Sequence, residues 1–302
     1  MKDENAVLKA IPERLLAWYD RCARKLPWRE NRDPYRIWIS EIMLQQTRVE
    51  AVKEYYTRFL AAFPDVFSLA EAPEEQVLKL WEGLGYYSRA RNLQKAAQVV
   101  AEMYGGRFPR TAAELSKLPG IGSYTAGAIS SIAFDCREAA VDGNVLRVAA
   151  RLLASRDNVS RQTVKNEVAE QIRAVIPPRA GDFNQSLMEL GATVCLPNGE
   201  PLCGACPLAD ICEGRKQGIA GDLPVKTQKK ERTSEEKTVF VLLWDGRAAF
   251  RKRPDTGLLA GMWEFPNVPG ALAEEQAVRQ LEEWGLAPLN LSPTAPAKHI
   301  FT

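Results

Sequence analysis

Histidine is almost missing from this chain of 302 residues, which contains a single one, His299. Catalytic triads built on imidazole, two-histidine zinc helices and histidine-rich metal sites are therefore excluded. Proton transfer at an active site of this protein must use carboxylates, tyrosine, lysine or cysteine instead.

Long hydrophobic runs are also missing. No segment approaches the roughly 18 uncharged apolar residues that a transmembrane helix needs, and the charged first five residues lack the apolar core of a signal peptide. We therefore expect a protein of the cytoplasm, at the nucleoid if the source is bacterial, that has no contact with a membrane and acts as a monomer.

The chain has little excess charge of either sign, with 40 basic and 38 acidic residues and a net charge of +2. This balance excludes a histone-like basic protein but allows a local basic face. One stretch has such an excess, and it is either a solvated helix face or a set of phosphate contacts. Its basic residues are Arg14, Arg21, Arg24, Lys25, Arg29, Arg32 and Arg36.

The composition is that of a globular protein, and the length suggests about two domains. Residues 11–216 show apolar positions at helical spacing between glycine and proline turns, which predicts a helical domain. A polar segment at 221–237 is typical of a linker. Beyond it, the pattern predicts a buried strand at 238–244, a hairpin turn at Asp245-Gly246, a partner strand at 248–252, and a helix at 274–284 that Gly285 ends.

Four of the six cysteines lie within 18 positions, at Cys195, Cys203, Cys206 and Cys212. In a reducing compartment, such a group is more typical of a metal site than of disulfides. Four thiolates suit either one zinc ion or a cubane iron–sulfur cluster, and the single Cys-x2-Cys pair favours the cluster somewhat. Either centre would stabilise a loop that has no core of its own.

Two glycine-containing turns are candidates for DNA contact. Residues 118–126 (LPGIGSYTA) join two predicted helices, and Gly120 and Gly122 would leave backbone N–H groups free for a phosphate. Residues 82–87 form a second turn, whose tyrosines could meet bases. Each could also be an ordinary connection between helices.

Two carboxylates are candidates for catalysis. Asp142 comes just before an apolar helix, where it could be a helix N-cap or a site residue. Glu41 lies in an apolar segment that resembles the start of a helix, where burial would raise its pKa and suit it to be a general acid. A first-turn glutamate without catalytic function has the same pattern.

Together, the segments 26–29, 40–47, 81–87, 118–126 and 141–144 and the four cysteines resemble the helix-hairpin-helix DNA glycosylase superfamily, and within it the adenine DNA glycosylases. The resemblance implies a mainly α, two-lobed catalytic domain at 1–220. This domain would have a six-helix barrel at about 28–136 and a [4Fe–4S] module from the N-terminal helix and about 137–220. After the linker, 238–302 would be an α+β Nudix-like domain, which we expect to be incomplete at its C-terminus.

The resemblance also implies the activity, which is removal of adenine mispaired with 8-oxoguanine or guanine in duplex DNA. By this resemblance, Glu41 is the general acid, Asp142 stabilises the sugar cation, and Tyr124 and Asn144 orient the site. Adenine would contact Trp28, Arg29, Leu44 and Gln185. The DNA contacts would be Gln46, Thr47, Leu84, Tyr86, Gly120, Gly122, Phe301 and Thr302, and the cluster ligands would be the four cysteines.

Several positions depart from related patterns. Tyr124 stands where bifunctional glycosylase/lyases have a nucleophilic lysine, so we expect a monofunctional enzyme. Val278 and Arg279 replace metal-binding residues of Nudix hydrolases, so pyrophosphate cleavage is not expected. The first cysteine gap is seven residues, whereas the family has six.

Two alternative functions remain open. They are a bifunctional glycosylase for oxidised pyrimidines and a non-catalytic iron–sulfur DNA-binding or redox protein.

Overall fold

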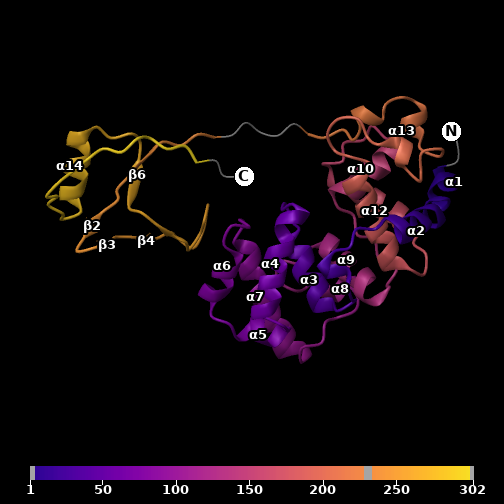
Figure 1. Cartoon of the computed structure of the whole chain (residues 1–302), viewed down its shortest axis with the longest axis horizontal. Helices are drawn as coiled ribbons and strands as arrows, with labels where there is room; N and C mark the ends of the chain where they lie inside the picture. Colours follow the sequence, from indigo (N-terminus) through magenta and orange to yellow (C-terminus); the bar gives the residue numbers. More distant parts are fainter. Residues whose placement is uncertain (1–3, 228–232, 300–302) are drawn as a thin grey trace. The chain divides into compact units, whose positions relative to one another are not determined.

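The computed structural model describes residues 4–227 and 233–299 (Figure 1). These residues divide into two compact units, one on each side of the gap. Each unit is described by itself.

The first unit is helical throughout. Among the described residues, no helix is both long and apolar enough to cross a membrane. The helices are α1 (Glu4–Lys9), α2 (Ile11–Cys22), α3 (Pro34–Met43), α4 (Val49–Ala62), α5 (Val66–Glu71), α6 (Glu74–Trp81), α7 (Ser88–Tyr104), α8 (Ala112–Leu115), α9 (Ser123–Phe134), α10 (Gly143–Leu152), α11 (Gln162–Arg173), α12 (Ala180–Thr193) and α13 (Glu213–Lys216), with 3₁₀ turns at Pro27–Arg29, Cys203–Ala205 and Ala220–Asp222.

Two hydrophobic cores hold these helices together. Buried side chains of α3 to α7 and α9, with Trp38, Phe59 and Trp81 among the largest, form the first core. Those of α1, α2 and α10 to α12 form the second. Met188 of α12 packs against both cores, so this helix joins the two lobes of the unit.

Polar residues fix where the helices of the first core begin. Asp33 caps α3 by accepting a hydrogen bond from the Tyr35 N–H at 2.9 Å, and Pro34 occupies the first helical position, where its missing N–H costs nothing. The pattern Thr111-Ala112-Ala113-Glu114 predicts a helix N-cap with Glu114 at the reciprocal position, and Thr111 does cap α8 by accepting a hydrogen bond from the Glu114 N–H.

Glycines allow α12 to approach its neighbours closely. A Cβ at Gly181 would lie 2.7 Å from the Ile132 backbone in α9, and one at Gly191 would lie 2.5 Å from the Cβ of Asn144. Larger side chains would push α12 away from both the glycine hairpin helix and the start of α10. These contacts set the geometry of the cleft described below.

The second unit contains three short antiparallel strand pairs and one helix. The pairs are β1 (Lys237–Val239) with β6 (Asn267–Pro269), β2 (Leu243–Trp244) with β3 (Arg247–Ala248), and β4 (Arg251–Lys252) with β5 (Trp263–Glu264), and the helix is α14 (Glu274–Glu283). Phe240, Ala277 and Leu281 form its small core. A mainly helical chain with a small C-terminal strand region confirms the predicted fold class.

The buried strand predicted at 238–244 is wrong in part. The segment divides into β1 and β2, and Val239, Leu243 and Trp244 are exposed. The turn itself is confirmed, because Asp245 and Gly246 both have positive φ and join β2 to β3. The predicted partner at 248–252 also divides, since its second part pairs with β5.

Candidate active site

A cleft of about 1500 Å³ lies in the first unit. It brings together twelve of the predicted site residues, which come from segments more than 150 positions apart. They are Trp28, Arg29, Glu41, Leu44, Gln46, Thr47, Tyr86, Gly122, Tyr124, Asp142, Asn144 and Gln185.

Four predicted DNA contacts are not among the residues of this cleft. Leu84 is buried in the first hydrophobic core, and its contact with DNA stays a prediction. Gly120 has a φ of 74° and packs against Asn92, where it shapes the hairpin without lining the cleft. Phe301 and Thr302 lie outside the described residues.

Glu41 lies in the last turn of α3, not at a helix start as the sequence suggested. The helix begins seven residues earlier, at the Asp33-Pro34 cap. Glu41 is only 6% exposed, and the Tyr124 hydroxyl donates a 2.6 Å hydrogen bond to its Oε2. Burial raises the pKa of Glu41 to about 7, although the Tyr124 hydrogen bond opposes the rise. Near neutral pH, this carboxyl therefore keeps a proton that it can donate.

Asp142 is both an N-cap and a cleft residue. Its Oδ1 accepts a hydrogen bond from the Val145 N–H at 2.8 Å, and Asn144 Nδ2 donates to Oδ2 at 2.7 Å. Burial raises the pKa of Asp142, and these two hydrogen bonds oppose the rise. Its charge also helps to keep Glu41 protonated. The two carboxyl groups thus have different environments, as an acid and a charge stabiliser require.

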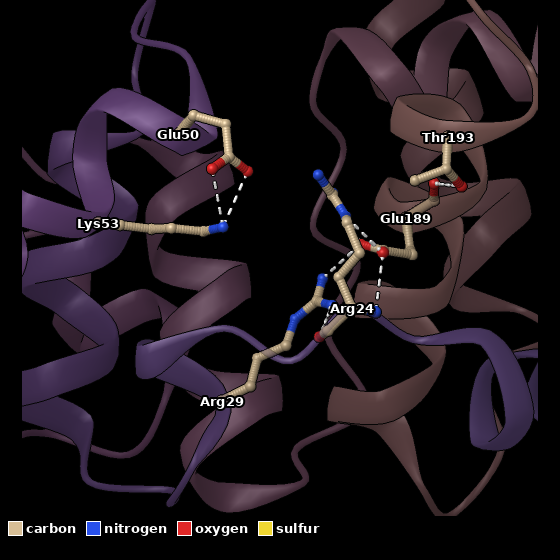
Figure 2. A network of polar contacts seen from close by, with 6 residues as sticks. All are labelled: Arg24, Arg29, Glu50, Lys53, Glu189 and Thr193. Carbon is tan, nitrogen blue, oxygen red and sulfur yellow. Dashed lines mark hydrogen bonds and ion pairs between the residues drawn. The ribbon is translucent and has the colours of Figure 1, made fainter.

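Glu189 of α12 also lines the cleft, and the sequence reasoning missed it. Its buried carboxylate receives the Arg24 side chain at 2.6 and 2.9 Å and Arg29 Nη2 at 2.9 Å (Figure 2). Burial alone would raise the pKa of Glu189, but the two arginines hold it below its usual value. Its position one helical turn after Gln185 is the signal that could have revealed it.

Arg89 holds the two turns that present Gln46 and Tyr86. Its guanidinium donates to five backbone carbonyl groups, those of Ile42, Met43, Gln45, Leu84 and Gly85, at 2.5–3.3 Å. Gln46 and Tyr86 have φ values of 58° and 48°, in the left-handed region that non-glycine residues rarely adopt. Tyr86 is 41% exposed and lines the cleft, so its ring is accessible there.

Most of the basic side chains of the stretch at 14–36 have acidic partners within the chain. Five of its arginines are ion-paired with carboxylates of the same chain. The pairs are Arg14 with Asp210, Arg24 and Arg29 with Glu189, Arg32 with Asp135 and Asp182, and Arg36 with Asp33. Arg14, Arg32 and Arg36 remain exposed, as a solvated face requires, and phosphate contact by this stretch stays a prediction.

The four clustered cysteines line one small cavity and are all free thiols. Burial, together with the charges of the other three cysteines, raises the pKa of Cys206 to about 11. Within residues 4–227 and 233–299, no three His, Cys, Asp or Glu side chains are close enough to hold one metal ion. Because the four sulfurs line one cavity, these residues could together hold a metal centre.

Two arginines of α10 connect this cavity with the cleft. Arg147 donates to Asn144 Oδ1 and to the Cys195 carbonyl, both at 2.8 Å. Arg151 lies 3.3 Å from Cys195 Sγ and donates to the Leu196 carbonyl at 2.8 Å. The cysteine loop therefore supports the helix that begins at Asp142.

The sequence is similar to those of known proteins. Residues 39–174 match the family described as HhH-GPD superfamily base excision DNA repair protein, and residues 238–302 match the NUDIX domain. The chain is 39% identical to the adenine DNA glycosylase of Rattus norvegicus, over 98% of this chain and 67% of that protein.

Solved structures show the same fold for the first unit. A thermostable thymine-DNA glycosylase matches with a TM-score of 0.64 and 30% identity, over 71% of this chain and 99% of that one. A trapped endonuclease III–DNA covalent intermediate matches with a TM-score of 0.60 and 25% identity, over 71% of this chain and 98% of that one.

Proposed function

This chain belongs to the adenine DNA glycosylases, enzymes of base excision repair, and on that premise we propose that it acts on adenine mispaired with 8-oxoguanine or guanine. We propose further that it is monofunctional: it hydrolyses the N-glycosidic bond with water as the final nucleophile and does not cleave the DNA strand.

One observation carries the proposal, namely the buried Glu41 beside Asp142 and Tyr124 in the cleft. An acid with a pKa of about 7 can protonate a base at neutral pH, whereas an ordinary glutamate would already be ionised. Because the cleft brings a second carboxylate to the same place, the positive charge that develops on the sugar would also be stabilised.

The reaction begins with adenine out of the base stack, since the bond is not accessible within a duplex. Glu41 donates its proton to N7 of adenine, and the bond between C1′ and N9 breaks with its electron pair going to the base. Asp142 stabilises the oxocarbenium-like sugar, directly or through a covalent adduct, as in glycoside hydrolysis. Water then adds to C1′ and releases its proton, while Tyr124 and Asn144 orient the two carboxyl groups.

The adenine pocket would use the residues around these carboxyl groups. Trp28, Leu44, Arg29 and Gln185 line the cleft and supply apolar surface and polar groups for a flipped base. Gln46 and Tyr86 would enter the stack near the orphaned base, with Thr47 beside them. The hairpin, where Gly122 begins α9 without a side-chain cap, would bind phosphate through N–H groups.

The four cysteines would hold a [4Fe–4S] cluster. When bound, the cluster would supply folding free energy to residues 195–212, which contain only a short 3₁₀ turn. Arg147 and Arg151 would then hold the cysteine loop against α10, so that Asp142 keeps its position. The one-residue-longer first gap would be accommodated by residues 196–202.

The second unit would recognise the oxidised guanine. It matches the NUDIX domain, but Val278 and Arg279 of α14 offer no carboxylate to a metal ion. Recognition without hydrolysis is therefore the function that its residues support.

The test is a set of duplexes that contain A opposite 8-oxoguanine, A opposite guanine, or an oxidised pyrimidine. We expect free adenine from the first two, an intact strand until alkali is added, and little borohydride-trapped adduct. Efficient trapping would contradict the monofunctional mechanism, and excision of the oxidised pyrimidine alone would contradict the substrate. Binding without any base release would favour a non-catalytic protein.

A further inference from the structure

Seven basic side chains line the cleft, and five of them, all arginines, have partners within the chain. Arg24 and Arg29 bind Glu189, Arg89 and Arg147 bind backbone carbonyl groups, and Arg173 binds Glu138 and Glu170. These cations are therefore already largely compensated before DNA arrives.

The other two are lysines. Within the described part of the chain, neither Lys165 nor Lys226 makes a side-chain hydrogen bond or an ion pair, although both line the cleft. The acidic residues of α11 do not compensate Lys165, since Glu170 pairs with Arg173, and Glu167 lies two positions away, where side chains do not face each other.

The two lysines belong to neighbouring segments. The Val159 N–H donates to the Val225 carbonyl at 3.0 Å, and the Thr227 N–H donates to Ser160 Oγ at 3.2 Å. Lys226 is thus held beside residues 158–160, which lead directly into α11. Lys165 lies in the first turns of that helix, so the two lysines lie on neighbouring segments that line the same cleft.

We propose that Lys165 and Lys226 form a phosphate-binding site for the DNA backbone, separate from the glycine hairpin. The proposal rests on the proposed function because its ligand is the duplex that the cleft accepts. When an ammonium group without an ion-pair partner neutralises a DNA phosphate, the counterions of that phosphate are released, and this release favours binding. The site carries no base specificity, because phosphate contacts position the protein and base contacts specify the sequence.

The test measures the dissociation constant for a fully matched duplex, which is not a substrate, at several salt concentrations. Lys165→Gln and Lys226→Gln should each reduce the slope of log K against log salt by about 0.9, and the double variant by about 1.8 if two phosphates are bound. At about 0.1 M salt, each loss weakens binding by up to roughly tenfold. The control is Lys9→Gln with Lys95→Gln, which removes two exposed lysines outside the cleft.

A slope in the double variant equal to that of the wild type would overturn the proposal, as would weaker binding with an unchanged slope. Thermal melting confirms that each variant is folded. If the wild-type protein binds duplex DNA but releases no adenine, the proposed function is wrong. The salt dependence of binding would still test the lysine site on its own.

Discussion

The hydrogen bond from Tyr124 to Glu41 makes a specific prediction about pH dependence. The hydroxyl stabilises the ionised carboxylate, so it lowers the pKa of Glu41 against the stronger effect of burial. Tyr124→Phe removes this hydrogen bond and keeps the ring. The protonated, proton-donating form of Glu41 should then persist to higher pH.

The magnitude follows from the geometry. A hydrogen bond to a charged acceptor contributes about 1.5–3 kcal/mol, and about 1.4 kcal/mol corresponds to one pH unit. At 2.6 Å and with a buried acceptor, the full range applies. The pKa of Glu41 should therefore move from about 7 to roughly 8–9 in the variant.

The assay is single-turnover adenine release from an A:8-oxoguanine duplex between pH 5.5 and 10. The ratio of the maximal rate to the half-saturating enzyme concentration reports the free enzyme, whose pKa is at issue. For the wild type, this ratio should fall as pH rises through about 7, and in Tyr124→Phe the fall should occur about one to two units higher. Tyr104→Phe, outside the cleft, is the control. An unchanged midpoint, or one moved to lower pH, would refute this reasoning.

Three further predictions concern stability and the cysteine site. Because burial raises the pKa of Glu41 in the folded state above its unfolded value of 4.5, ionised Glu41 destabilises the fold as pH rises from about 4.5 to 7. Glu41→Gln should therefore raise the free energy of unfolding, measured in urea, by about 3 kcal/mol more at pH 8 than at pH 4.5. An equal increase at both pH values would contradict the effect of burial. Arg24→Met leaves Glu189 with two of its four hydrogen bonds and should lower the free energy of unfolding by about 2–3 kcal/mol, whereas Arg14→Met, at an exposed pair, should cost less than about 1 kcal/mol. Cys206→Ser should lose iron and visible absorbance and melt at lower temperature, while Cys22→Ser should change none of these; full iron content in Cys206→Ser would exclude it as a ligand.

The sequence predicted correctly those features that depend only on residues close together in the chain. The caps at Thr111 and Asp142, the hairpin at Asp245-Gly246 and the helix before Gly285 all depend on neighbouring residues. A cap requires only a side-chain oxygen and the next N–H groups, so local pattern suffices to predict it.

Contacts between segments that are distant in the chain could not be predicted from such local patterns. Glu189 lies 165 positions from Arg24, and no pattern in either segment predicts that the two side chains pair. For the same reason, the sequence did not show that Arg14, Arg24, Arg29 and Arg32 pair with carboxylates more than 100 positions away. Glu41 was placed at the wrong end of its helix because the apolar run hid the true start at Asp33. The prediction of one buried strand at 238–244 was wrong in part because a continuous apolar run does not show where a strand breaks or which of its side chains are exposed.

The account depends most directly on Glu41 as the proton donor. The decisive measurement is adenine release by Glu41→Gln from an A:8-oxoguanine duplex under single turnover at pH 7, with the dissociation constant measured in parallel. The account predicts a rate lower by about 10²–10⁴-fold and a dissociation constant within a few-fold of the wild-type value. Release within tenfold of the wild-type rate would contradict it.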